Sequence, residues 1–118
     1  MGGETLKIDT RHVLAVGDMS DEVTAMLGDL GYQPVLIRDP EFGRDVQSFR
    51  EGHEWHMRFE YTATKQVRID VRVQTRAGTT WLHFYEPDSE TLSPASKALL
   101  QKLEDRAVLE FGPTNVSR

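Results

Sequence analysis

The segments EWHMRFEYT (residues 54–62) and QVRIDVRVQT (residues 66–75) decide the fold of this chain. In both segments apolar residues alternate with polar or charged ones, which is the pattern of a β-strand with one buried face and one wetter face. When Phe59 is placed opposite Ile69, apolar residues meet on one face and opposite charges meet on the other, as cross-strand pairing favours. The two segments therefore predict an antiparallel hairpin in this register.

A third strand is predicted at residues 80–85 (TWLHFY), directly after a turn that contains a glycine. Apart from His83, this segment is apolar on both faces, which is typical of a central strand or of a strand whose outer face binds a partner. Its orientation stays open, because either Leu82 and Phe84 or Trp81 and its alternate neighbours can face the core.

Two helices are predicted, one at residues 20–30 and one that begins after Ser93. In the first, apolar residues recur at helical spacing, Asp18 or Ser20 can serve as the N-cap, and Gly31 can end the helix in a left-handed conformation. In the second, Ser93 is a favourable N-cap and a proline occupies the first helical position. Both helices are expected to pack an apolar stripe against the sheet.

The stretch between the first helix and the hairpin is less regular. We expect a short strand at residues 33–38 that starts after Pro34, where the missing N–H does least harm. We expect residues 39–53 to form a surface loop held by Phe42 and Phe49, although the spacing of their apolar residues also allows a short helix. Connections of this length are often functional or mobile in compact domains.

Three further predictions concern the remaining segments. Residues 12–16 are expected to form a short strand. Residues 107–111 are expected to form either a last short strand or a frayed end. The two ends of the chain, about 1–5 and 112–118, are expected to be flexible.

Together these elements predict an α+β fold. The expected architecture is a two-layer sandwich, an antiparallel β-meander with two helices packed on one face. The chain has 118 residues and no internal repeat, which fits a single domain spanning residues 1–118. Many small binding modules share this architecture, so the fold class by itself assigns no function.

The composition excludes several classes of function. The chain has no cysteine, so disulfide frameworks, cysteine-based zinc sites and thiol catalysis are excluded. Its net charge of −5 argues against broad binding to nucleic acid or to anionic membranes, and no apolar run is long enough to span a bilayer. Eight of the 14 basic residues lie within residues 32–85, so any basic surface is expected there.

The sequence leaves the compartment open. No apolar leader segment follows the start of the chain. This fits a cytoplasmic protein and equally a protein of the cell envelope or periplasm from which a leader has been removed. The lack of cysteine fits both compartments as well.

No catalytic constellation is found, and we predict that the protein is not an enzyme. The serines lie at expected caps, loops and ends, and none has the context of a nucleophile elbow. Asp70 is expected to form an ion pair with Arg58 on a solvated face. Glu60 is expected to pair in the same way with Arg68, so neither carboxylate is expected to act as an acid or a base.

The histidines offer one conceivable metal site. If His83 faces outward, it can join His56 and Glu54 in a three-ligand cluster of the kind that binds zinc. His53 points to the opposite face of its strand from His56, so these two cannot easily share a metal. Four scattered histidines need no metal to explain them, and we predict neither a metal nor a cofactor.

The best candidate for a binding surface is the outward face of the predicted sheet. Its candidate residues are His56, Arg58, Arg68, Arg72, Trp81, His83 and Tyr85. Arginine beside tryptophan and tyrosine is a combination enriched at protein interfaces and at their hot spots. We therefore predict a non-enzymatic module that recognises another protein through its sheet face or an exposed edge strand.

Two alternatives stay open beside this prediction. The first is a small-molecule carrier or a weak metal-dependent enzyme, with its site between the sheet and residues 39–53. A closed core beneath Phe42 and Phe49, without a pocket, would argue against this alternative. The second is a homodimer that forms through an unblocked strand edge.

Overall fold

The computed structural model describes residues 4–11, 19–66 and 68–118. Within these residues, seven strands form one antiparallel sheet: β1 (Glu4–Asp9), β2 (Tyr32–Pro34), β5 (Ser48–Glu51), β6 (Glu54–Tyr61), β7 (Arg68–Arg76), β8 (Thr79–Tyr85) and β9 (Val116–Ser117). The order in the sheet is β2-β6-β7-β8-β1-β9, and β5 pairs with β6 beside β2. The remaining elements are a small hairpin of β3 (Ile37–Arg38) and β4 (Asp45–Val46), the helices α1 (Ser20–Asp29) and α2 (Pro94–Phe111), and a short 3-10 helix, η1 (Pro113–Asn115).

The central strands confirm the predicted antiparallel meander. β6 pairs with β7 in the predicted register, with Phe59 opposite Ile69. β8 pairs with the other edge of β7, so the three strands follow one another in sequence and in space. The open orientation of β8 is settled, because Leu82 and Phe84 are fully buried while Trp81 and its alternate neighbours face the other side.

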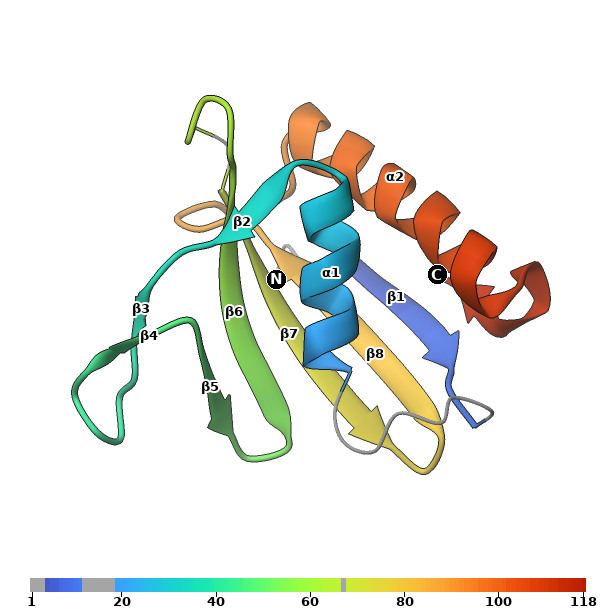
Figure 1. Ribbon diagram of the computed structural model, residues 1–118, viewed down its shortest axis with the longest axis horizontal. Coiled ribbons are helices and arrows are strands. Elements are labelled where there is room, and N and C mark those ends of the chain that lie inside the picture. The colour runs from blue at the N-terminus through green and yellow to red at the C-terminus, as the bar shows by residue number, and fades with distance from the viewer. Residues whose placement is uncertain (1–3, 12–18, 67) are drawn as a thin grey trace.

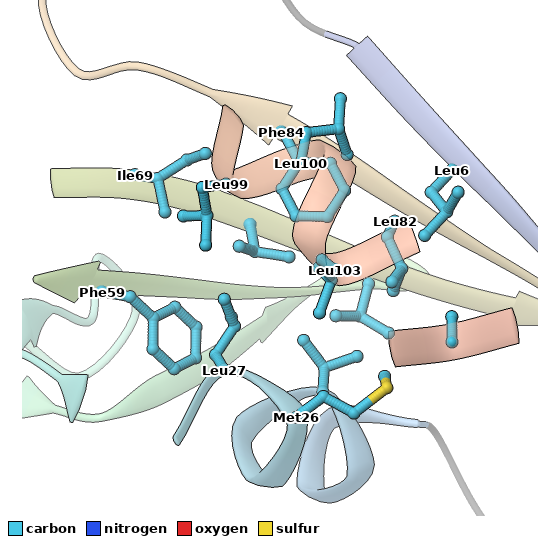
Figure 2. Packing of buried hydrophobic residues seen from close by; sticks show 14 of the residues in the cluster. Leu6, Met26, Leu27, Phe59, Ile69, Leu82, Phe84, Leu99, Leu100 and Leu103 are labelled. Atoms are coloured by element: carbon cyan, nitrogen blue, oxygen red, sulfur yellow. The ribbon is translucent and has the colours of Figure 1, made fainter. Parts of the chain in front are cut away.

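Both helices lie on one side of the sheet, as the α+β prediction requires (Figure 1). We call the side of the sheet that meets the helices the inner face. Figure 2 shows the core between the two layers, where side chains from both helices pack against the strands. The fully buried side chains include Phe59, Ile69, Leu82, Phe84, Leu27, Leu100 and Leu103.

The start of α1 differs from the prediction. The predicted cap at Ser20 is wrong, because Ser20 is already helical and its carbonyl accepts a hydrogen bond from the Thr24 hydroxyl. Met19 holds the N-cap position without a capping side-chain hydrogen bond, and the alternative cap Asp18 lies outside the described residues. The end of the helix is as predicted, with a φ of 91° at Gly31.

Helix α2 begins as predicted and continues further than predicted. The hydroxyl oxygen of Ser93 accepts a backbone N–H of the first turn at 3.2 Å, and a proline follows it. Residues 107–111 belong to the helix, so both alternatives given for them, a strand and a frayed end, are wrong. The physical reason is packing: Ala107 is fully buried one turn beyond Leu103 and continues the apolar stripe that faces the sheet.

The two ends of the described chain are also more ordered than predicted. Strand β1 places Leu6 and Ile8, both fully buried, on the inner face and pairs with β8. Residues 4 and 5 belong to this strand, so the flexible start predicted at 1–5 is wrong there. The tail predicted at 112–118 contains η1 and β9, and β9 pairs with β1. The strand predicted at residues 12–16 lies outside the described residues.

Strand β2 corrects the prediction for residues 33–38. It ends at Pro34, instead of starting after it, and residues 35–36 separate it from β3. β2 lies at the edge of the sheet, where a proline at the end of a strand removes no ladder hydrogen bond.

Residues 39–53 form neither the predicted loop nor the alternative helix. They contain β4 and β5, and β5 adds to the sheet beside β6. Asp39 closes the turn before β4, because its carboxylate accepts the backbone N–H groups of Glu41 and Phe42. Phe42 is 67% exposed and does not hold the segment against the core, whereas Phe49 is half-buried against the sheet.

Candidate functional site

The side of the sheet opposite the helices carries the predicted binding residues. We call the side of the sheet that is turned away from the helices the outer face (Figure 1), and the outward-pointing side chains of β6, β7 and β8 form its middle. Their register places Arg58 beside Asp70 and Tyr85 in one row and His56 beside Arg72 in the next. Strand periodicity alone brings these residues together, because every second side chain points to the same side.

The central row of the outer face crosses five strands. It runs from Phe49 on β5 through His56, Arg72 and His83 to Thr5 on β1. The Phe49 and His56 rings are stacked with centroids 4.9 Å apart. At the other end, a hydrogen bond of 2.9 Å joins Thr5 Oγ1 and His83 Nδ1. Both ends of the row are therefore fixed by side-chain contacts.

Arg72 occupies the middle of this row. Its guanidinium carbon lies 4.7 Å from the centroid of the Tyr85 ring, which is a cation–π contact. The guanidinium makes no hydrogen bond or ion pair with any other described residue. The contact with Tyr85 positions the cation but leaves its N–H donors available.

The other charges of the outer face are mostly paired. Arg58 donates to Asp70 through Nε (2.6 Å) and Nη2 (3.1 Å), which confirms the predicted pair. The pair predicted between Glu60 and Arg68 does not form: although the two residues are opposite in register, Glu60 instead accepts a hydrogen bond from Gln33 at 3.0 Å. Gln33 lies on β2, the strand that ends at Pro34 instead of starting after it as predicted.

The surroundings of His56 favour the neutral form of its imidazole. Burial lowers the pKa of its imidazole, and the positive charge of Arg72 lowers this pKa further. Nearby carboxylates, Glu51 and Glu54 among them, act in the opposite direction without cancelling the effect. His56 is therefore neutral at pH 7 and can both donate and accept a hydrogen bond.

A cavity of about 360 Å³ opens beside His56 and Arg72. Its wall on the sheet side is formed by β6 and β7, with Arg58 and Asp70 contributing, and its other wall by β3 and the residue before it. The lining residues outside the sheet are Leu36, Ile37 and Arg38. Phe49, from the segment predicted as a loop, also lines the cavity. A closed core without a pocket would argue against the small-molecule alternative. The structure instead contains this cavity.

The three-ligand cluster considered for a metal is not assembled. His83 Nε2 lies 4.0 Å from Glu54 Oε2, but the side chain of Arg72 stands between His83 and His56 in the row. Among the described residues no group of three histidines or carboxylates is arranged to hold a metal ion.

The two serines near the start of α2 have a structural role. The hydroxyls of Ser93 and Ser96 donate to one carboxylate oxygen of Glu86, which also accepts the Ser93 backbone N–H. These hydrogen bonds lower the pKa of Glu86. The cluster fixes the chain at the beginning of the helix.

The candidate residues fall into three groups. His56, Arg58 and Arg72 line the cavity, while the outward side chains of β8 (Trp81, His83 and Tyr85) continue the same face toward β1. Arg68 is exposed and stands apart, at a second cavity of about 410 Å³ near the start of α2.

Sequence reasoning missed the wall of the cavity at residues 36–38. The alternation within residues 54–75 marked the sheet face, but no periodic signal linked residues 36–38 to that face. The one available signal was the apolar run Val35, Leu36 and Ile37. This run indicates a strand, but it does not indicate where that strand lies relative to the sheet.

Comparisons of the chain with protein-family models, with curated proteins and with solved structures found no match. Neither helix in the described part of the chain combines the length and the apolar character that crossing a membrane requires. Any function must therefore be argued from the site itself.

Proposed function

We propose that this protein is a non-enzymatic binding module that recognises another protein through the outer face of its sheet. One observation carries the proposal. Arg72 sits at the centre of a face that the helices leave uncovered, is positioned by Tyr85, and makes no hydrogen bond or ion pair with other described residues. A half-buried cation with free donors is suited to a partner that supplies acceptors.

The chemistry around Arg72 supports a protein as the partner. Trp81 and Tyr85 offer aromatic surface on the same face, and arginine, tryptophan and tyrosine dominate binding hot spots. Glu54, Glu60 and Asp70 share the face and would repel a nucleic-acid backbone, as would the net charge of −5.

The edge strand next to this face extends the proposed surface. β5 pairs with β6, and its opposite edge pairs with no other described strand. An extended segment of a partner can add to such an edge through backbone hydrogen bonds while its side chains reach the outer face. The face and the edge thus form one continuous surface.

Affinity capture from a lysate tests the proposal. The bait is compared with a triple variant, Arg72→Ala with Trp81→Ala and Tyr85→Ala, and with a matched triple variant on exposed positions of α2, Lys97→Ala with Lys102→Ala and Leu109→Ala. Circular dichroism checks that all three baits are folded. We expect one protein to be captured by the wild type and the α2 variant and lost by the outer-face variant. Equal capture by all three baits would show that the outer face is not the recognition surface.

A second candidate function is a small-molecule carrier, and the cavity beside Arg72 favours it. Its volume of about 360 Å³ is at the small end of ligand sites, which span roughly 300–1,000 Å³. Native mass spectrometry of the gently purified protein separates the two candidates. A carrier retains a small molecule of defined mass, whereas a protein-recognition module shows the mass of the chain alone.

A further inference from the structure

The charges that line the cavity leave one cation uncompensated. Three arginines line it. Arg58 is neutralised by its two hydrogen bonds to Asp70, and Arg38 lies 3.5 Å from Asp45. Arg72 has no such partner among the described residues. The described lining thus has three arginines and one carboxylate, and Asp45 lies outside the lining but balances Arg38. Once these two pairs are set aside, one positive charge is left, at the guanidinium of Arg72.

The same cavity has an apolar side. Leu36, Ile37 and Phe49 line it, and Leu36 is 64% exposed. Covering an exposed leucine with a ligand lowers the free energy of the complex, because apolar area is removed from water. The cavity thus presents a cation and an apolar wall to the same occupant.

His56 adds a neutral polar group between these two parts. Its ring stacks on Phe49 on one side and neighbours Arg72 across the strands. Because burial and Arg72 keep the imidazole uncharged, it can give a hydrogen bond to an anionic ligand without adding a second positive charge.

We propose that this cavity binds a single carboxylate group attached to a small apolar body, with the guanidinium of Arg72 as its counter-ion. The inference rests on the proposed function and deepens it, since it assigns the carboxylate to an acidic side chain of the partner protein. A guanidinium presents its N–H donors as a fork that matches the two oxygens of a carboxylate. The contact with Tyr85 leaves this fork unused.

A carboxylate fits better than a phosphate group. A phosphate monoester carries roughly −1.5 to −2 charges at pH 7 and would leave excess negative charge beside Asp70. A carboxylate matches the one uncompensated positive charge. The second cavity, near α2, provides a contrast within the same molecule. Its described lining contains Glu86, Asp88 and Arg68 besides Arg58, which is already paired with Asp70, so it holds no excess positive charge.

An NMR titration with phenylacetate tests the carboxylate, and the neutral phenylacetamide serves as the matched probe. We expect phenylacetate to cause saturable shifts at the Arg72 Nε–Hε signal and at the amides of residues 36–38. Phenylacetamide is expected to leave these signals in place. Equal shifts with both probes, or no shift with either, would overturn the inference.

Two variants on the same strand make the test specific. Arg72→Gln is expected to weaken phenylacetate binding at least about tenfold, because a charge-assisted hydrogen bond is lost. Arg76→Gln changes an exposed arginine that does not line the cavity, and it is expected to bind as the wild type does. Equal weakening by both variants would mean that any positive charge on this strand, rather than the site at Arg72, attracts the probe.

A peptide arm identifies the source of the carboxylate. We compare a blocked pentapeptide with glutamate between two leucines and the same peptide with glutamine. Tighter binding of the glutamate peptide than of phenylacetate supports a partner's side chain. Tighter binding of phenylacetate overturns that source in favour of a free acid. If no carboxylate binds while capture still depends on the outer face, the inference fails and the proposed function stands.

Discussion

The inner and outer faces of β6, β7 and β8 differ in how deeply their side chains are buried and in what these side chains contact. Phe84 and Tyr85 are neighbours in sequence, yet Phe84 is fully buried in the core and Tyr85 lies half-buried under the guanidinium of Arg72. The inner face is closed by the helices, so its apolar groups are all used for stability. The outer face holds a cation with unused donors and a cavity. The difference shows that the apolar core lies on one side of these strands, whereas the other side keeps polar groups and a cavity that the fold itself does not fill.

The largest expected effect separates the two faces on one strand. Phe84→Ala should lower the free energy of unfolding by about 3–5 kcal/mol, because it empties a fully buried core position. Tyr85→Ala should cost only about 1 kcal/mol, since the ring is half-buried and its main contact is with Arg72. Urea denaturation of both variants measures the difference. Similar losses would mean that the outer face is also part of the stabilising core.

A smaller effect is expected from the ion pair on the outer face. Arg58→Ala should cost less than about 1 kcal/mol, because both side chains of the pair with Asp70 are about a third exposed to solvent. A double-mutant cycle with Asp70→Ala isolates the pair from other contacts of the two residues. A coupling of several kcal/mol would show that this pair behaves as a buried one and that the outer face is covered.

The pH dependence of stability provides a third comparison. The folded state depresses the pKa of His56, so the unfolded chain binds this proton more readily. The contribution is present above the ordinary histidine pKa of about 6.5, and stability is lost as the pH falls through the lowered folded value. His56→Gln should therefore show a shallower loss of stability between pH 7.5 and 5 than the wild type. His53→Gln, at an exposed position in the β5–β6 turn, is the matched control. An unchanged slope in His56→Gln would contradict the assignment.

The smallest effect is expected in the segment that leads from β3 to β4. Phe42→Ser should change the free energy of unfolding by less than about 0.5 kcal/mol, because the ring is 67% exposed. Thermal unfolding followed by circular dichroism measures this. A loss of more than about 1.5 kcal/mol would show that Phe42 packs against the rest of the protein, in agreement with the sequence-based prediction and against the structure.

Local periodicity predicted the parts of the fold in which the polarity of each residue follows its burial. The alternation around Phe59 and Ile69 fixed the register of β6 and β7, and hence which residues share the outer face. Strand β1 was missed because Leu6 and Ile8 are only two apolar residues, and they become a strand through pairing with β8. Its formation depends on partners far away in the sequence.

The same limit explains what was missed at the site. Arg58, Arg72 and His56 were placed correctly, because strand alternation decides which way they point. The cavity depends on where residues 36–38 cross the sheet, and nothing local encodes that position. Likewise, Glu60 bonds to Gln33 instead of Arg68 because β2 pairs with β6 as an edge strand. Tertiary contacts, rather than propensity, decide both features.

The affinity of the captured partner for two single variants decides whether the outer face is the recognition surface. Arg72→Gln and Arg76→Gln remove the same charge from the same strand, but only Arg72 lies in the central row of the outer face. Isothermal titration calorimetry should show at least about a tenfold weaker complex for Arg72→Gln and an unchanged complex for Arg76→Gln, with both variants as stable as the wild type. Unchanged affinity in Arg72→Gln would contradict the claim that the outer face is the recognition surface.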